Sequence, residues 1–240
     1  MSILAIETAS SVSSVAVASE GKLRAEVTVE AGRTHSETLL SHIEGALSFA
    51  GVERPMLTGV AVSIGPGSFT GLRIGLATAK AIAYGLGIPL VGVPTLAALA
   101  LAFPVPGVCT LALMDAQKGN AYAGLYEWKA GALHEVRPVC VAPLAEVVAE
   151  AAALGKPVVL TGELVKKRRA RLGELPENVA LAPAHFLAAR ASCVAWLGQE
   201  RLLAGESDDP MTLEPFYIRR SEAEVLWEKR HGAAKEEAPC

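Results

Sequence analysis

One order of predicted elements occurs twice in this chain, and it restricts the fold more than any other feature. In the first half, the runs ILAIET, SVAVAS and LRAEVTVE predict three consecutive strands joined by tight turns. A helix is predicted from His35 to Ala50, because its apolar residues fall on one stripe, and Thr34 with Glu37 forms a capping box at its start. The run GVAVSIG predicts a strand, and a second helix begins near Thr70.

The same order of elements returns after a proline-rich bridge. Strands are predicted in VCTLALMD, NAYAGLYEW, LHEVRPVCV and PVVLTG, with a helix in PLAEVVAEAAAL and further helices over residues 163–172 and 186–204. Two β-β-β-α-β-α halves that share a cleft describe the α/β architecture of actin, Hsp70 and the sugar kinases. We therefore expect an actin-like (ASKHA) fold with an N-terminal half at 1–105, a C-terminal half at 106–222 and a charged, flexible tail at 223–240.

Charge and cysteine spacing exclude several classes of protein. A formal net charge of −3 gives no general attraction for nucleic acid, so a basic surface for RNA would have to come from a partner. The four cysteines lie far apart without a CxxC pair, which indicates reduced thiols rather than a disulfide framework or a zinc site. Prolines interrupt the uncharged run from Ala81 to Met114, so it is too short to span a membrane. We expect a cytoplasmic protein with no signal peptide and no membrane contact.

The glycine-rich stretch GPGSFTGLRIG, at residues 65–75, raises the question of a phosphate site. It matches neither the P-loop, which needs GxxxxGK[ST], nor the dinucleotide loop GxGxxG. It connects a strand to a helix N-terminus, where free N–H groups attract anions. We predict a structural role, with a positive φ at Gly67, and keep anion binding as the alternative. The residues of this loop are Gly65, Gly67, Ser68, Thr70 and Arg73.

The turns between the first two strands of each half are the second place where a nucleotide could bind. In actin-like folds these turns approach the phosphates, and here they read ETASSVSS and DAQKGNAY. Neither has the Asp-Gly-Gly type of turn through which a backbone grips phosphate closely. Two ordinary hairpins and a weak nucleotide site therefore both remain open. Glu7 and Asp115 end strands next to these turns, and as single carboxylates they are weak evidence for catalysis.

The helix after the glycine loop has a face that is almost bare of side chains. Gly71, Gly75, Ala79 and Ala83 recur every four residues along it. This face fits either internal packing or the close approach of a helix from a partner, and we adopt the second interpretation because the helix from His35 would complete a two-helix patch. The residues predicted to bind the partner are His35, Leu39, His42, Ile43, Gly71, Leu72, Gly75, Leu76 and Ala79.

Five stretches together resemble one known family. GPGSFTGLRIGLATAKAIA, THSETLLSHIEGAL, LAIETA, MDAQKGNAY and the closing EPFYIRRSEAEVLWEKR are similar to the TsaB (YeaZ) family, from end to end of the chain. That family is the non-catalytic partner of the TsaD subunit in bacterial threonylcarbamoyladenosine modification of tRNA. The resemblance implies an actin-like fold and a homodimer or heterodimer made through the two N-terminal helices.

The resemblance also implies that this chain has no active site of its own. Its catalytic relatives carry a histidine pair for a metal just after the strand that follows the glycine helix. Here that stretch is VGVPTLAALA, which has no histidine, cysteine or carboxylate and cannot hold a metal. No Ser-His-Asp or Cys-His arrangement follows from residue spacing either, so we expect neither a catalytic residue nor a metal ligand.

We expect a scaffold or activator that binds a TsaD-type catalytic subunit and works with a TsaE-type ATPase on tRNA. In isolation it would be a homodimer. No cofactor is expected on this chain alone, and a weakly bound adenine nucleotide at the junction with the partner is the one exception. The basic run KKRRAR at 166–171 is interpreted as a solvated helix face, and it is the first place to look for tRNA contact. The alternative is a small-molecule kinase or ATPase of the same fold.

Overall fold

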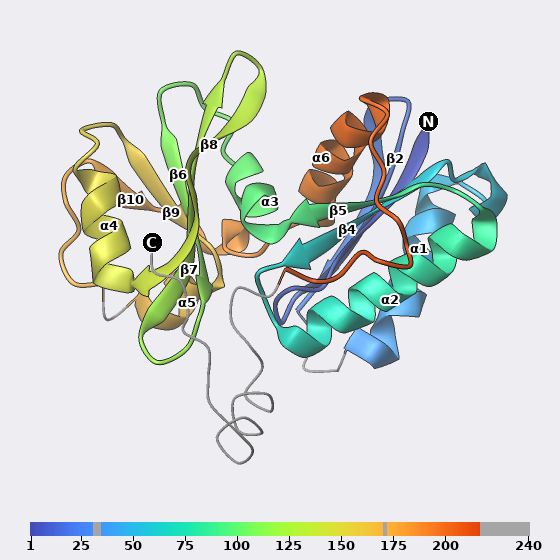
Figure 1. Ribbon diagram of the computed structural model, residues 1–240, viewed down its shortest axis with the longest axis horizontal. Coiled ribbons are helices and arrows are strands. Elements are labelled where there is room, and N and C mark those ends of the chain that lie inside the picture. The colour runs from blue at the N-terminus through green and yellow to red at the C-terminus, as the bar shows by residue number, and fades with distance from the viewer. Residues whose placement is uncertain (31–34, 170–171, 217–240) are drawn as a thin grey trace.

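Each half of the chain builds a five-stranded mixed sheet, and the two sheets form the two lobes of the computed structural model (Figure 1). The structure describes residues 1–30, 35–169 and 172–216. Thr34 and the tail at 223–240 lie outside the described residues, so the capping box and the flexible tail stay predictions. The actin-like α/β fold is the one predicted from the repeated order of elements.

The N-terminal lobe follows the prediction closely. Its sheet has the order β3-β2-β1-β4-β5, in which β1, β2 and β3 pair antiparallel and β4 and β5 run parallel to β1. These strands are β1 (Ser2–Glu7), β2 (Ser13–Ser19), β3 (Lys22–Val29), β4 (Gly59–Gly65) and β5 (Leu90–Pro94). Leu4 and Ile6 of β1 point to one face, and there they pack under α1 (His35–Ala50) and α2 (Phe69–Leu86). A short 3-10 helix, η1 (Arg54–Met56), connects α1 to β4.

The C-terminal lobe repeats this plan with the sheet order β10-β9-β6-β7-β8. Its elements are β6 (Cys109–Asp115), β7 (Asn120–Lys129), β8 (Ala132–Pro143), α4 (Leu144–Ala152), β9 (Val158–Thr161), α5 (Glu163–Arg168) and β10 (Val179–Leu181). The helix predicted over residues 163–172 ends at Arg168. The three-residue strand β10 was not predicted, because so short an apolar run has no readable period.

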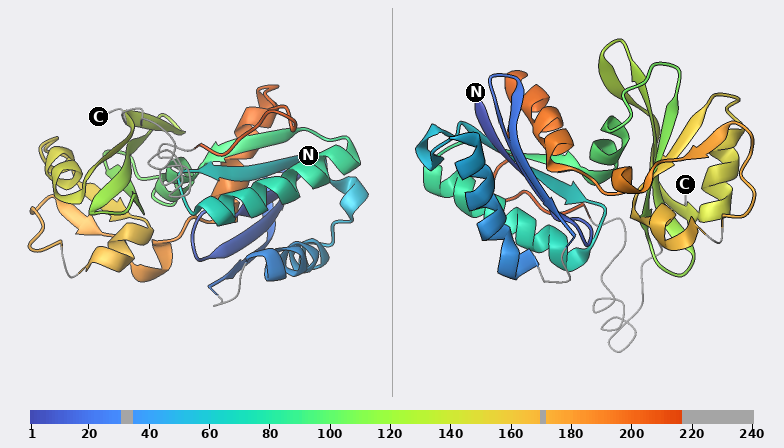
Figure 2. Two further views of the ribbon diagram at one scale, coloured as in Figure 1. Left: turned by 60° about the horizontal axis from the view of Figure 1, so that its bottom comes forward. Right: turned by 180° about the vertical axis from the view of Figure 1, so that it is seen from behind.

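The last helix, α6 (Ala191–Leu203), packs on the sheet of the N-terminal lobe although it follows the second sheet in the chain (Figure 2). Division of the chain at residue 105 assigned this helix to the C-terminal half. Its Val194 and Ala195 instead cover Ile3 and Ala5, on the face of the sheet opposite α1 and α2. The helix predicted from residue 186 also starts later, because Arg190 is extended and only a 3-10 turn, η3 (Ala184–Phe186), precedes it.

Polar contacts fix the start of α6 against the first sheet. The backbone N–H of Ala191 donates to the hydroxyl of Ser14 over 3.0 Å. The carboxylate of Glu26 accepts the backbone N–H and the hydroxyl of Ser192, over 2.9 and 2.7 Å, and pairs with the guanidinium of Arg190. These contacts satisfy donors that a helix N-terminus otherwise leaves free.

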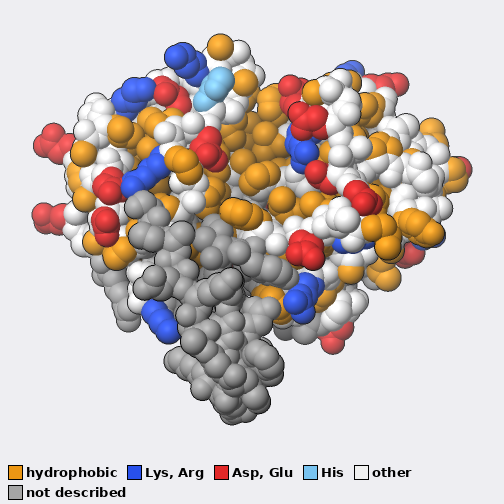
Figure 3. Space-filling view, viewed as in Figure 1, with side chains coloured by type: hydrophobic (Ala, Val, Ile, Leu, Met, Phe, Trp, Pro, Cys, Tyr) orange, Lys and Arg blue, Asp and Glu red, His pale blue; other side chains and the backbone are white. Residues whose placement is uncertain are grey.

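The two lobes meet around α3 (Thr95–Leu101), which is buried between them. Leu96 and Leu99 of α3 pack in one core cluster with Met114 of β6. Trp128 of β7 and Trp196 of α6 add a ring contact with centroids 5.8 Å apart. Hydrophobic side chains are also visible in the notch between the lobes in the space-filling view (Figure 3). The two lobes are therefore held together by apolar contacts as well as by the covalent connections of the chain.

We expect Gly198→Val to separate α6 from the first sheet. A Cβ at position 198 would collide with the side chain of Ala61 on β4, so the added methyl groups have no room. Overpacking of this kind destabilises a fold by about 1–3 kcal/mol. Chemical denaturation measures the change, and Glu200→Val, at an exposed position of the same helix, is the control. Equal stability of the two variants would contradict the packing described here.

Candidate functional site

The turn between β1 and β2, residues 8–12, is held against the start of α2. The hydroxyl of Thr8 donates to the carbonyl of Gly71 over 2.8 Å, and the backbone N–H of Ser68 donates to the carbonyl of Ala9 over 2.7 Å. The hydroxyl of Ser68 accepts the N–H of Gly71 and caps α2. Several donors and acceptors of the glycine loop, on Ser68 and Gly71, are thus used inside the chain, which favours its structural role over anion binding.

The reason why Gly67 must be glycine differs from the prediction. Gly65, with a φ of +113°, has the positive φ, and Gly67 does not. A Cβ at Gly67 would instead lie 2.5 Å from the carbonyl oxygen of Ala9 and 2.7 Å from its Cβ. Glycine is needed there for the close approach of two backbones. Of the other loop residues, Thr70 is exposed, and the guanidinium of Arg73 lies 3.8 Å from the ring centroid of Phe69.

The same turn and the first residue of β2 anchor α1 through two histidines. Nε2 of His35 contacts the carbonyl oxygen of Ser10 at 2.7 Å, and Nδ1 of His42 contacts the hydroxyl of Ser13 at 3.0 Å. Burial lowers the pKa of His42, and the charge of His35 lowers it further. Both histidines were predicted to bind the partner, and the structure gives them contacts that position α1.

The bare face of α2 is turned inward, which corrects its assignment to the partner-binding patch. Gly71 and Gly75 face the end of β1, and a Cβ at either position would collide with Thr8. Ala79 and Ala83 are 0% and 1% exposed against the same sheet. The large residues of the predicted patch are equally buried, namely Leu39, Ile43, Leu72 and Leu76. The interpretation as internal packing, which the sequence left open, is the one that fits.

A second row of small residues on α2 points away from the sheet. Ala77, Ala81 and Gly85 also recur every four residues, and all three are exposed. On α1, which lies beside α2, Ser41 and Ser48 are exposed as well, and Gly45 between them is half-buried (Figure 1). We call these six residues the outer face. They were missed because the two stripes of α2 look alike, and only Leu72 and Leu76 beside the first stripe indicate which one is buried.

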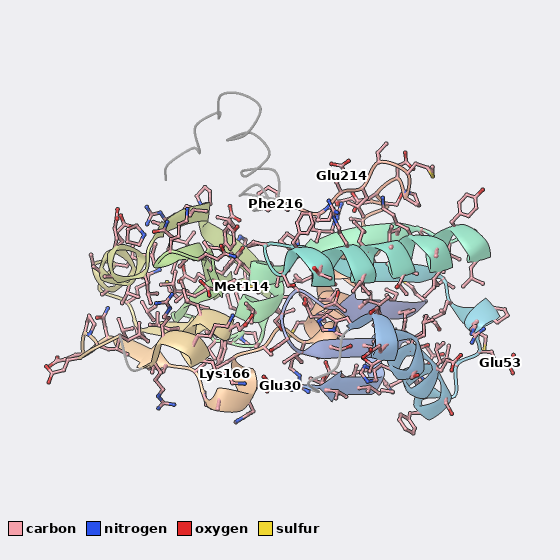
Figure 4. All side chains as sticks on the ribbon, turned by 90° about the horizontal axis from the view of Figure 1, so that it is seen from below. Glu30, Glu53, Met114, Lys166, Glu214 and Phe216 are labelled. Carbon is pink, nitrogen blue, oxygen red and sulfur yellow. The ribbon has the colours of Figure 1, made fainter. Side chains whose placement is uncertain are left out.

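An ion pair connects the two lobes, and further charged groups pair beside it. Nζ of Lys166 on α5 lies 2.6 Å from a carboxylate oxygen of Glu30, which follows β3 of the other lobe (Figure 4). The hydrogen bond and the charge of Lys166 lower the pKa of Glu30. Lys167 pairs with Glu163 over 2.5 Å and lies 3.8 Å from Asp115. Two cations of the basic run therefore already have carboxylate partners, and the end of the run at 170–171 lies outside the described residues.

Neither a metal site nor a membrane span is found within the part of the chain that the structure describes. That part holds no group of three or more His, Cys, Asp or Glu side chains that could bind a metal ion. None of its helices is long and apolar enough to cross a bilayer. Cys109 and Cys193 are free thiols, whereas Cys140 is disulfide-bonded, which differs from the expectation of reduced thiols throughout.

Comparison with known proteins gives consistent matches. The family model described as TsaD, tRNA N6-adenosine threonylcarbamoyltransferase, matches residues 27–227. The tRNA threonylcarbamoyladenosine biosynthesis protein TsaB of Bacillus subtilis is 30% identical over 230 residues, which is 95% of this chain and 98% of that protein. TsaB of Escherichia coli is 36% identical over 129 residues, or 53% of this chain and 55% of that protein.

Two solved structures from Pseudomonas aeruginosa have the same fold over almost their whole length. One, described as similar to the peptidase YeaZ, has a TM-score of 0.79 at 26% identity and covers 91% of this chain and 99% of its own. The other is YeaZ itself, with a TM-score of 0.76 at 27% identity, covering 90% of this chain and 99% of its own.

Gly75→Leu should unfold the chain, whereas Ala77→Leu should leave it stable. The side chain at 75 would enter the space of Thr8, and that at 77 would enter solvent. We expect a loss of about 3 kcal/mol or more for the first variant and a change within about 0.5 kcal/mol for the second. Urea titrations followed by circular dichroism measure both, and a well-folded Gly75→Leu would contradict the inward orientation of the bare face.

Gly67→Val should lower the melting temperature, because the side chain collides with Ala9. We expect a destabilisation of about 2 kcal/mol or more. Ala149→Val, at an exposed position on α4 of the other lobe, serves as the control. Melting curves with and without ATP and magnesium separate the two roles of the loop. If ATP stabilises the wild type and fails to stabilise a folded Gly67→Val, the loop binds phosphate and the structural role is wrong.

Proposed function

The chain belongs to the TsaB family of tRNA threonylcarbamoyladenosine biosynthesis proteins, and we propose that it acts there as a non-catalytic subunit that binds the TsaD-type catalytic subunit. The contact would be made by the outer face of α1 and α2. The complex would work in the cytoplasm on tRNA, together with a TsaE-type ATPase. The isolated chain would form a homodimer through the same face.

The outer face is the observation that carries this proposal. Two neighbouring helices present small side chains to solvent, at Ser41, Gly45 and Ser48 on α1 and at Ala77, Ala81 and Gly85 on α2. Small residues let another pair of helices approach closely. Because small side chains have few rotamers, little side-chain entropy is lost when a partner covers them. The charged residues of α2, Arg73 and Lys80, lie to one side of this row. On α1 the exposed Glu44 lies beside Gly45 and pairs with Arg54, so a partner that covers the face has to accommodate this charged pair.

The stretch Val91–Ala100 supports the absence of catalysis in this chain. It forms β5 and the start of α3, and its Leu96 and Leu99 are 0% and 2% exposed in the core between the lobes. Packed aliphatic side chains cannot ligate a metal ion, and they carry no positive charge that could stabilise the charge developing in a transition state. Transfer of a threonylcarbamoyl group would therefore rely on residues of the partner.

The pair formed by Ser13 and His42 is the nearest approach to a hydrolase dyad. Their 3.0 Å contact has the length of a nucleophile–base hydrogen bond. However, Ser13 is 3% exposed and lies in β2 beneath α1, where no substrate carbonyl can reach its hydroxyl. The burial of Ser13 favours a structural role for this hydrogen bond. The Ser13–His42 contact therefore does not support the peptidase description given to one of the similar structures.

Ala81→Arg should abolish binding of the TsaD-type subunit without affecting the fold. The guanidinium would be desolvated without a carboxylate, so we expect affinity to fall by about 100-fold or more. Isothermal titration with the purified catalytic subunit measures the change. Ala149→Arg, an exposed alanine on α4 of the other lobe, is the matched control and should bind like the wild type. Undiminished binding by Ala81→Arg would show that the partner uses another surface.

Reconstitution tests the non-catalytic role itself. With tRNA, threonine, bicarbonate, ATP, the adenylate-forming enzyme, the TsaD-type subunit and the ATPase, modified adenosine should fall to background when this chain is left out. Modified adenosine formed by this chain and the adenylate-forming enzyme alone would make it the catalyst. Sub-micromolar ATP binding by the isolated chain would favour a kinase or ATPase instead.

A further inference from the structure

Glu7 is a carboxyl group buried at the centre of the N-terminal lobe. It ends β1 and is 0% exposed. Its Oε1 accepts the backbone N–H of Ala9 over 2.6 Å, but its Oε2 has no hydrogen-bond partner among the described residues. Ser63 of the neighbouring strand β4 is also fully buried, and its hydroxyl also lacks a well-formed hydrogen bond there. The carboxyl group of Glu7 and the hydroxyl of Ser63 are thus two neighbouring buried groups that can hydrogen-bond to each other.

Within residues 1–30, 35–169 and 172–216, the cation nearest to the surroundings of Glu7 that is identified by its contacts, Arg190, is already paired. Its partner is Glu26. Burial is the main cause that raises the pKa of the Cys193 thiol on α6 to about 11, and the charges of Glu26, Arg190 and Glu7 have smaller effects on it. The helix α3 has no ionisable side chain, and on α1 His35 and His42 contact the same turn from its other side. Burial accordingly raises the pKa of Glu7 to about 7, against the opposing effects of the Ala9 N–H and of Ser63.

A single residue connects this carboxyl to α2. The N–H of Ala9 donates to Glu7, and the carbonyl of Ala9 accepts the N–H of Ser68, the N-cap of α2, over 2.7 Å. The backbone of Ala9 also touches Gly67, so it cannot move without moving the glycine loop. An ionised Glu7 attracts the Ala9 N–H more strongly than a neutral one does. A change of charge on Glu7 therefore acts on the start of α2.

We propose that the protonation state of Glu7 regulates the position of α2, so that partner binding at the outer face is stronger when Glu7 is neutral and weaker when it is ionised. The neutral acid can donate from Oε2 to the hydroxyl of Ser63 while Oε1 keeps the Ala9 N–H, so both oxygens are satisfied. The ionised form keeps a charge in the core with only the Ala9 N–H and the Ser63 hydroxyl to donate to it, and the turn shifts as the Ala9 N–H is drawn more strongly toward Oε1. This proposal rests on the proposed function only in its statement about partner binding.

The direction of the pH effect follows from linkage. The pKa of Glu7 is about 7 in the folded chain and 4.5 in the unfolded one, so the folded chain holds the extra proton. The resulting stabilisation is complete below pH 4.5 and is lost as the pH rises through 7. Between about pH 5 and 6.5, one extra bound proton changes the unfolding equilibrium constant about tenfold per pH unit.

Glu7→Gln tests this in the isolated full-length chain, because glutamine has the shape of the neutral acid and cannot ionise. The ratio of unfolding constants of wild type and Glu7→Gln should change about tenfold per pH unit between about pH 5 and 6.5. Taking this ratio removes the contributions of His35 and His42, which both proteins share. Glu200→Gln, at an exposed position, should show no such slope against the wild type. A ratio independent of pH would overturn the proposal.

Carbon-13 NMR of the wild-type carboxyl groups keeps the test valid if Glu7→Gln does not fold. Glu7 should titrate with a midpoint near 7, and the amide signals of Ala9 and Ser68 should follow the same curve. A midpoint near 4.5, or amide signals that do not follow, would also overturn the proposal.

Titration of the TsaD-type subunit at pH 6 and pH 8 tests the regulation. The affinity of the wild type, divided by that of Glu7→Gln at the same pH, should be at least about 3-fold lower at pH 8 than at pH 6. Equal pH dependence in both would refute regulation by Glu7 and leave the proposed function standing, whereas no binding by either at any pH would refute the proposed function.

Discussion

The close contact between the β1–β2 turn and the start of α2 is the constraint on which the N-terminal lobe depends. Three glycines, Gly67, Gly71 and Gly75, lie where any Cβ would strike Ala9 or Thr8. With the turn held there, Ser10 and Ser13 meet the histidines of α1, and Ser14 meets the start of α6. One short hydroxyl-rich segment thereby orients three helices. In actin-like folds this turn approaches phosphate, but here its polar groups are occupied by the chain itself.

The fold could be predicted well because its strongest signals are local. Alternating apolar residues and the stripe of α1 determine strands and helices without reference to the rest of the chain. The side of the sheet that a helix covers is a tertiary property, and no periodicity in Ala191–Leu203 indicates that it returns to the first lobe. The start of this helix was misjudged for a similar reason, since residues 187–190 have helix-compatible composition but are drawn out to reach the other lobe.

The site could be predicted only in outline. The choice of α1 and α2 as partner-binding helices stays a prediction. The face of α2 that was chosen for the contact is the buried one, and the two rows of small residues on this helix differ only in their neighbours. Leu72 and Leu76 need burial more than Arg73 and Lys80 do, and this difference decides which row faces the sheet. The contacts of His35 and His42 could not be predicted from spacing, since their partners, Ser10 in the turn and Ser13 at the start of β2, lie 25 and 29 residues earlier in the chain.

The return of α6 to the first lobe sets the order in which the protein can fold as it is synthesised. Until residue 191 has left the ribosome, the apolar face of the first sheet with Ile3, Ala5 and Val91 lacks the helix that covers most of it, and only α3 packs there, through Ala98. Roughly 100 residues separate the last strand of this sheet from α6, and at about 5–20 residues per second their translation takes on the order of 5–20 seconds. The second sheet is translated within this interval, so the lobe that begins first is completed last.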